Sequence, residues 1–178
     1  MEYPVNFRRF VPQDAEFCFK VRSEAFIQKF YGELNPQEIS AGVNAYMPHD
    51  YSEMAAQMPL FIVEDQGVSL GFFAIKRAHK LTAELLLIYI DLSHLGRGIG
   101  RSCIQFIEKW LSTNWPEIKS LIVDTVIPVY NREFYQRLGF FPDIQTFCDF
   151  AGVKVKALRL CKKVDHENTN QTGNSRRH

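Results

Sequence analysis

The chain has 178 residues, of which 46% are hydrophobic, and its formal net charge at pH 7 is +1. This length and apolar content suit one domain with a sizeable core. The balanced charge gives no electrostatic reason to expect nucleic-acid or membrane binding as the main role.

Hydrophobic periodicity and turn residues predict an α/β chain. The predicted elements, in chain order, are strand 5–10, helix 14–30, helical pieces 36–46 and 50–57, strands 60–64, 69–78 and 82–92, a helix ending near 114, strand 121–126, helix 131–138, and strands 145–150 and 153–161. We expect one domain over residues 1–164. Residues 165–178 have almost no apolar side chains to bury and are expected to form a disordered tail.

Targeting and metal-binding patterns are not apparent in the sequence. The first ten residues have no apolar core, and the longest apolar run, Leu85–Ile90, is far too short to span a bilayer. The four cysteines lack the CxxC spacing of metal or redox sites, and the histidines are scattered. We therefore expect a cytoplasmic protein with reduced cysteines, no metal and no membrane partner.

Three glycines follow the most apolar predicted strand directly. Gly96, Gly98 and Gly100 lie in a turn that leads into a helical pattern. Glycine allows the backbone to approach a bulky anion closely, and the free N–H groups at the start of a helix can bind phosphate oxygens. The turn lacks the Gly-Lys-Ser/Thr of a nucleotide P-loop, and Arg101 stands where a dinucleotide fingerprint needs a small residue.

Two blocks resemble the Gcn5-related N-acetyltransferases (GNAT family). Arg97-Gly98-Ile99-Gly100 matches the core of the family's Q/R-x-x-G-x-G/A loop, and the segment from Asn131 to Phe140 matches its F/I-Y-x-x-L-G-F block. The blocks occur in the family order, about 30 residues apart, within a resemblance that covers roughly residues 60–141. The resemblance implies a single-domain GNAT-like fold, with a mixed, mostly antiparallel sheet and helices on both faces.

The resemblance also implies an acetyl-CoA site. Its pantetheine arm would lie beside Ile90, Asp91 and Leu92, and its diphosphate would meet the loop and two nearby cations. An asparagine near position 131 often contacts the cofactor in the family, although Asn131 would equally cap the helix that follows it. The implied loop residues are Leu95, Gly96, Arg97, Gly98, Ile99, Gly100 and Arg101. Leu95 departs from the usual Gln or Arg, and Leu92 from a common proline.

Two residues are candidates for proton transfer. Tyr135 matches the family tyrosine that points at the thioester sulfur, where it would act as the acid. Its alternative role is that of a core tyrosine packed on neighbouring phenylalanines. Glu84, eleven residues before Leu95, matches the glutamate base of the histone-acetylating branch, and strict strand alternation would place it on the face of Ile90. A solvated glutamate at the strand start, Asp91 as the base, or catalysis without a base are the alternatives.

The resemblance implies that the acceptor binds between the segments 31–57 and 141–154, which contain aromatic and acidic side chains. These side chains are Tyr31, Tyr46, His49, Asp50, Tyr51, Glu53, Met54, Asp143, Phe147, Asp149 and Phe150. The favoured function is acetyl transfer from acetyl-CoA to a primary amine, in a small molecule or a peptide. A silent acyl-CoA-binding module and an enzyme acting on a protein or tRNA are the alternatives, and the sequence leaves monomer and homodimer open.

Overall fold

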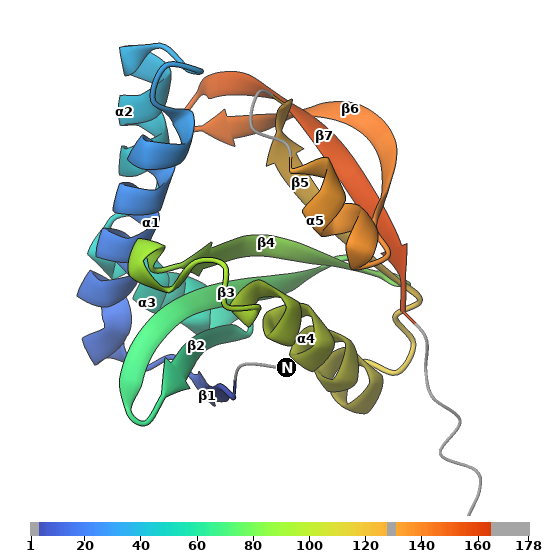
Figure 1. The fold of residues 1–178 in the computed structure, drawn as a ribbon. Coiled ribbons are helices and arrows are strands. Elements are labelled where there is room, and N and C mark those ends of the chain that lie inside the picture. Colours follow the sequence, from blue (N-terminus) through green and yellow to red (C-terminus); the bar gives the residue numbers. More distant parts are fainter. Residues whose placement is uncertain (1–3, 128–130, 165–178) are drawn as a thin grey trace, which may run out of the picture.

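A seven-stranded sheet forms the centre of the computed structural model, which describes residues 4–127 and 131–164 (Figure 1). The order of the strands across the sheet is β1-β2-β3-β4-β5-β7-β6. The predicted tail, 165–178, lies outside the described residues. The strands are β1 (Asn6–Arg9), β2 (Leu60–Asp65), β3 (Val68–His79), β4 (Thr82–Ile90), β5 (Ser120–Val126), β6 (Phe141–Phe150) and β7 (Val153–Lys163).

The helices follow the predicted order along the chain. They are α1 (Ala15–Phe30), α2 (Pro36–Asn44), α3 (Pro48–Gln57), α4 (Ile99–Asn114) and α5 (Arg132–Arg137), with 3-10 turns η1 (Pro12–Asp14) and η2 (Leu92–His94). Local signals fix several boundaries. At α2, for example, the Asn35 side chain accepts a hydrogen bond from the Glu38 N–H, and the Glu38 carboxylate accepts one from the Asn35 N–H, both at 2.9 Å.

Helices cover both faces of the sheet, as the resemblance implies. On one face, Cys103, Ile104 and Ile107 of α4 join a cluster with the inward residues of β2–β5. On the other face, Cys18 and Val21 of α1 pack with α3 against β2–β4. The C-terminal part of α1, with α2, packs over the far end of β5, β6 and β7 (Figure 1).

Among the seven described strands, β4 and β5 pair parallel and the other neighbours pair antiparallel, so the sheet is mixed and mostly antiparallel as expected. The parallel pairing is short: Thr82, Ala83 and Glu84 pair with Ser120, Leu121 and Ile122. Beyond these pairs, β5 continues its pairing with β7, and β4 continues its pairing with β3. The two strands therefore diverge at the centre of the sheet (Figure 1).

A β-bulge interrupts β4 and corrects the predicted alternation. Ala74 pairs with Leu87 and Ile75 pairs with Leu85, so Leu86 has no residue opposite it on β3. An extra residue in one strand reverses which face the following side chains occupy. The prediction that Glu84 shares the face of Ile90 is therefore wrong: Ile90 packs with the α4 cluster, whereas Glu84 lines a cavity on the α1 side.

Candidate functional site: two cavities that meet at Tyr135

The predicted glycine loop joins β4 to α4 and has an open backbone. Gly96 and Gly98 have φ angles of +78° and +81°, in the left-handed region that favours glycine. No atom outside the adjoining residues lies within 4 Å of the place where a Cβ would stand at either position. The loop therefore presents exposed main chain that a large ligand can approach.

The first turn of α4 presents unsatisfied N–H groups and positive charge. Its N-cap is Gly98, which has no side chain to cap the helix, and the first turn contains no acidic residue. The hydrogen bond from the Ser102 N–H to the Gly98 carbonyl is 3.1 Å long, so the N–H groups of residues 99–101 precede the first bond of the helix. Exposed Arg97 and Arg101 add cations beside the positive end of the helix dipole, where an anion would be stabilised.

A cavity of about 1040 Å³ lies in front of this helix end. It brings together the loop, the end of β4 and the second sequence block on α5. Of the predicted cofactor residues, Asp91 and Arg97 are not among those that line it. Those that do are Ile90, Leu92, Leu95, Gly96, Gly98, Ile99, Gly100, Arg101 and Asn131.

The two sequence blocks contact each other directly. A Cβ at Gly100 would lie 3.1 Å from the ring of Phe134, which is tighter than an ordinary van der Waals contact. Gly100 thus permits α5 to pack closely against the start of α4. Asn131 caps α5, because its side-chain oxygen accepts a hydrogen bond of 3.1 Å from the Phe134 N–H. The predicted capping role is confirmed, and the same residue also lines the large cavity.

Tyr135 lies where the large cavity meets a second, smaller one. The residue is 9% exposed, and its ring packs edge-on against the rings of Phe134 and Phe140, at centroid distances of 5.2 and 5.8 Å. Tyr135 lines both cavities, as do Lys29, Ile88 and Tyr89. Tyr135 therefore packs in the core and also lies between the two cavities.

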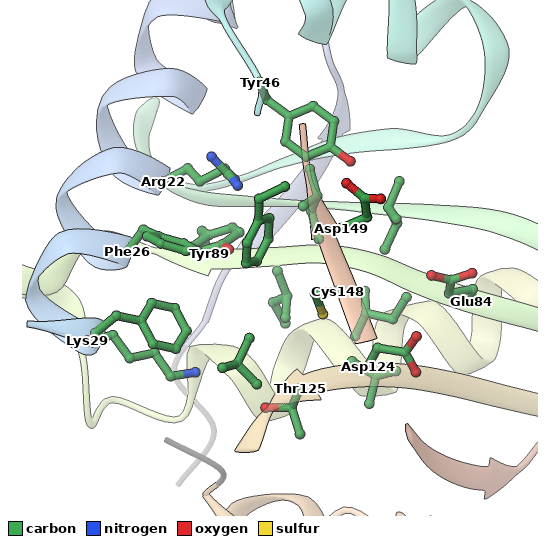
Figure 2. Close-up of a pocket in the computed structure, with 18 of the residues that line it drawn as sticks. Arg22, Phe26, Lys29, Tyr46, Glu84, Tyr89, Asp124, Thr125, Cys148 and Asp149 are labelled. Carbon is green, nitrogen blue, oxygen red and sulfur yellow. The ribbon is translucent and has the colours of Figure 1, made fainter. Parts of the chain in front are cut away.

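The smaller cavity, of about 260 Å³, lies between the diverging strands on the α1 side (Figure 2). Of the predicted acceptor residues, Tyr46, Phe147, Asp149 and Phe150 line it, and the others do not. The sequence reasoning missed six polar residues of its wall. These are Arg22, Lys29, Tyr89, Asp124, Thr125 and Cys148.

The two candidate bases have different surroundings. Glu84 lines the smaller cavity, with its side chain 15% exposed and its carboxylate 3.2 Å from the Lys76 ammonium. Asp91 lines neither cavity, and its carboxylate accepts hydrogen bonds from the N–H and hydroxyl of Ser93. These bonds hold the pKa of Asp91 below its usual value. The geometry favours Glu84 over Asp91 as a group that can contact an acceptor.

Burial shifts the pKa values of several groups around the smaller cavity. Desolvation raises the pKa of Tyr89, while the positive charge of the neighbouring Arg22 opposes that shift. Desolvation also raises the pKa of Cys148 to about 11, so this thiol is protonated at neutral pH. Much of Lys29 is exposed, yet desolvation lowers the pKa of its ammonium.

The residues that the structure describes contain neither a cluster of metal ligands nor a membrane-spanning helix. Within 4–127 and 131–164, no three His, Cys, Asp or Glu side chains are grouped so that they could hold a metal ion. None of the helices in the same residues is long and apolar enough to cross a membrane.

Comparison with known proteins identifies the family of this chain. A model of the Acetyltransferase (GNAT) domain matches residues 57–142, which include both sequence blocks. The chain carries a GNAT domain. It is an acyltransferase, and the resemblance read from the glycine loop and the Tyr135 block is confirmed. A search of curated proteins found no match to the sequence.

Solved structures share the GNAT fold over nearly the whole chain. A Gcn5-related N-acetyltransferase from Rhodopseudomonas palustris superimposes with a TM-score of 0.79 at 18% identity, covering 92% of this chain and 98% of that one. The PaiA N-acetyltransferase from Thermoplasma acidophilum, solved with coenzyme A, has a TM-score of 0.74 at 17% identity and covers 90% and 99%. The ribosomal-protein-S18-alanine N-acetyltransferase from Escherichia coli has a TM-score of 0.66 at 11% identity and covers 96% and 100%. At these identities the likeness establishes the fold.

Proposed function

We propose that this protein transfers an acetyl group from acetyl-CoA to the primary amine of a small molecule or peptide. The observation that carries the proposal is the position of Tyr135, between a large cavity with an anion-binding loop and a small cavity with an acidic wall. Two structural neighbours of the GNAT fold were solved with coenzyme A or acetyl-CoA bound, which supports the choice of cosubstrate.

The large cavity suits coenzyme A in both charge and shape. The open glycines and the N–H groups at the start of α4 would hold the diphosphate, with Arg97 and Arg101 nearby. The pantetheine arm would lie along the edge of β4 beyond Glu84, where the pairing with β5 has ended. Leu95 keeps its backbone N–H, so its departure from the family's Gln or Arg leaves main-chain recognition intact.

Proton transfer would require two groups, and the structure supplies a candidate for each. Acetyl-CoA supplies an acetyl group activated as a thioester. Glu84, in the wall of the smaller cavity, would take the proton that the attacking amine loses. Tyr135, at the junction with the large cavity, would donate a proton to the departing sulfur.

The volume of the smaller cavity favours a small acceptor. About 260 Å³ lies just below the range typical of sites for drug-sized ligands. A protein or tRNA acceptor would have to enter this cavity with a single side chain or a terminal residue. A silent acyl-CoA-binding module would keep the large cavity and would lack turnover with any amine.

Calorimetric titration with acetyl-CoA and CoA, with NAD and ATP as controls, tests the cofactor. We expect saturable binding of the two CoA species and none of the controls. A panel of amines, followed by release of the CoA thiol, then tests the reaction. Binding without turnover on any amine, peptide or tRNA would favour the silent module, and absence of acetyl-CoA binding would refute the proposed function.

A further inference from the structure

The smaller cavity contains a buried cation that has no anionic partner among the described residues. Arg22 of α1 is 1% exposed, and its guanidinium lies over the ring of Tyr46, with the central carbon 4.9 Å from the ring centroid. Its Nη1 donates a long hydrogen bond of 3.4 Å to the Val43 carbonyl, and its Nε finds no hydrogen-bond partner in the part of the chain that the structure describes. Across residues 4–127 and 131–164, no carboxylate forms an ion pair with it. A buried charge in this condition destabilises a protein unless an anion joins it.

Aromatic rings surround Arg22 without neutralising its charge. The guanidinium carbon lies 5.4 Å from the ring centroid of Phe26 and 5.7 Å from that of Tyr89. Such contacts favour a cation modestly, by about 0.5–2 kcal/mol each, and they leave the positive charge in place. Figure 2 shows the guanidinium pointing from α1 toward Tyr46 and Tyr89, in the wall of the smaller cavity.

The carboxylates of the same cavity already have partners within the protein. Glu84 forms an ion pair with Lys76 at 3.2 Å, and Asp124 forms one with Arg159 at 2.8 Å. The Asp149 carboxylate accepts a hydrogen bond of 2.7 Å from the Gly152 N–H. Its charge has no cationic partner among the described residues, so one unpaired anion remains on the strand side, and the unpaired positive charge lies on the α1 side.

Lys29 adds a second cation two helical turns after Arg22. Both side chains extend from α1 on one side of the cavity, and Glu84, Asp124 and Asp149 lie on the opposite side (Figure 2). Among the described residues, Lys29 likewise forms no ion pair with a carboxylate. The cavity is thus polarised across its width, cationic at α1 and anionic at the strands.

We propose that the acceptor of this enzyme is an amino acid or a similar small amino-carboxylate, whose carboxylate binds Arg22 and Lys29 while its amine faces Glu84 and Tyr135. This inference rests on the proposed function and deepens it. In the reaction the amine nitrogen bonds to the acetyl carbon and the C–S bond of the thioester breaks. One proton passes overall from the amine to the sulfur. The products are an N-acetylated amino-carboxylate and CoA, and the volume of about 260 Å³ suits a free amino acid.

Comparing each amino acid with its carboxamide tests the contribution of the substrate carboxylate alone. The twenty amino acids and their α-carboxamides are compared at saturating acetyl-CoA, with release of the CoA thiol as the readout. The carboxamide has nearly the same shape and no negative charge. We expect at least one amino acid to exceed its carboxamide about 100-fold in kcat/KM, the discrimination expected when a buried charged group loses its partner.

Substitutions of Arg22 and Lys29 test whether these two residues cause the preference for the acid over the amide. Arg22→Met replaces the buried charge with an apolar side chain and should bring the ratio of acid to amide close to one, mainly through a higher KM for the acid. Lys29→Met changes an exposed side chain, so it should fold normally and should lower the ratio about tenfold. Arg77→Met, which removes a half-exposed arginine paired with Glu117 outside both cavities, should leave the ratio unchanged.

A stability measurement separates a binding role for Arg22 from a structural one. Without its ligand the buried guanidinium should destabilise the free protein, so Arg22→Met should raise the melting temperature. A marked fall in the melting temperature would instead assign Arg22 to the aromatic core and overturn the proposal. The melting curves also show whether the variant is folded before its kinetics are compared.

Equal rates on acids and amides, with acetyl-CoA binding intact, would refute the amino-carboxylate inference alone. Should no member of the panel be acetylated, calorimetry with N-acetyl amino acids in the presence of CoA tests the same site. Binding of an N-acetyl amino acid but not of its amide would support the inference, and binding of neither would overturn it. Loss of acetyl-CoA binding would refute the proposed function as well.

Discussion

The glycine loop allows a matched pair of substitutions that separates cofactor binding from stability. Gly98 in the loop and Gly67 in the hairpin between β2 and β3 both have a φ angle of +81°, and neither has an atom within 4 Å of an added Cβ. Gly67 lines neither cavity. Gly98→Glu and Gly67→Glu therefore impose the same backbone strain and the same charge, and only the first places that charge at the proposed diphosphate site.

The two effects have different sizes. The left-handed conformation costs a non-glycine residue about 1–2 kcal/mol, so each variant should lose about 2–8 °C in melting temperature. Beside the proposed diphosphate the new carboxylate at Gly98 would be repelled, and two like charges about 5 Å apart cost about 3 kcal/mol at an effective dielectric constant near 20. We therefore expect Gly98→Glu to weaken acetyl-CoA binding about 100-fold or more.

Calorimetric titration with acetyl-CoA, together with thermal melting of both variants, measures each effect separately. Gly67→Glu should bind acetyl-CoA as the unmodified protein does, despite its lower melting temperature. If Gly98→Glu kept its affinity, or if Gly67→Glu lost affinity to the same degree, the placement of the diphosphate at the start of α4 would be wrong.

Four further substitutions test individual side chains. Tyr135→Phe should lower turnover about 100-fold or more and spare CoA affinity, and unchanged turnover would exclude it as the acid. Glu84→Gln should lower kcat/KM while sparing CoA affinity, and an unchanged kcat/KM would mean that the ion pair of Glu84 with Lys76 has only a structural role. Arg101→Gln should weaken CoA binding and stabilise the free protein by about 0.3–1 kcal/mol, because a cation no longer opposes the dipole of α4; lower stability would contradict this. Burial raises the pKa of Asp14, but hydrogen bonds from Arg8 and the Val11 N–H lower it overall. Its stabilising effect is thus present above the unfolded-state pKa and is lost as pH falls through the folded-state pKa. Asp14→Asn should cost about 2 kcal/mol at pH 7 and flatten the acid side of the stability curve, as chemical denaturation at several pH values would show.

Much of the fold could be predicted from local pattern, because most elements begin and end at local signals. The glycine loop, the α4 helix and the Tyr135 block were found where the sequence placed them. The strand predicted from residue 145 begins earlier, at Phe141. Pro142 and Asp143 resemble a turn, yet they lie in β6 at the edge of the sheet, where a proline is tolerated.

The proposed acceptor site was only partly predictable, because its charged residues come from elements far apart in the chain. Arg22 lies in the predicted first helix, four residues before Phe26 and therefore on the same side of the helix. An arginine on the apolar side of a predicted helix was the signal in the sequence that could have indicated the site. The partners that define the cavity, Asp124 on β5 and Cys148 on β6, become its neighbours only through the order of strands in the sheet.

The bulge at Leu86 links the register of one strand to the chemistry of the site. Before it, Ala83 and Leu85 face α4; after it, Ile88 and Ile90 do so, which strict alternation would not allow. The reversal leaves Glu84 and Tyr89 together on the α1 side, beside Arg22. A regular strand would have turned Tyr89 toward α4 and placed an isoleucine against the buried guanidinium. The polarised cavity therefore depends on one unpaired residue in β4, which apolar periodicity cannot reveal because the residues on both faces are hydrophobic.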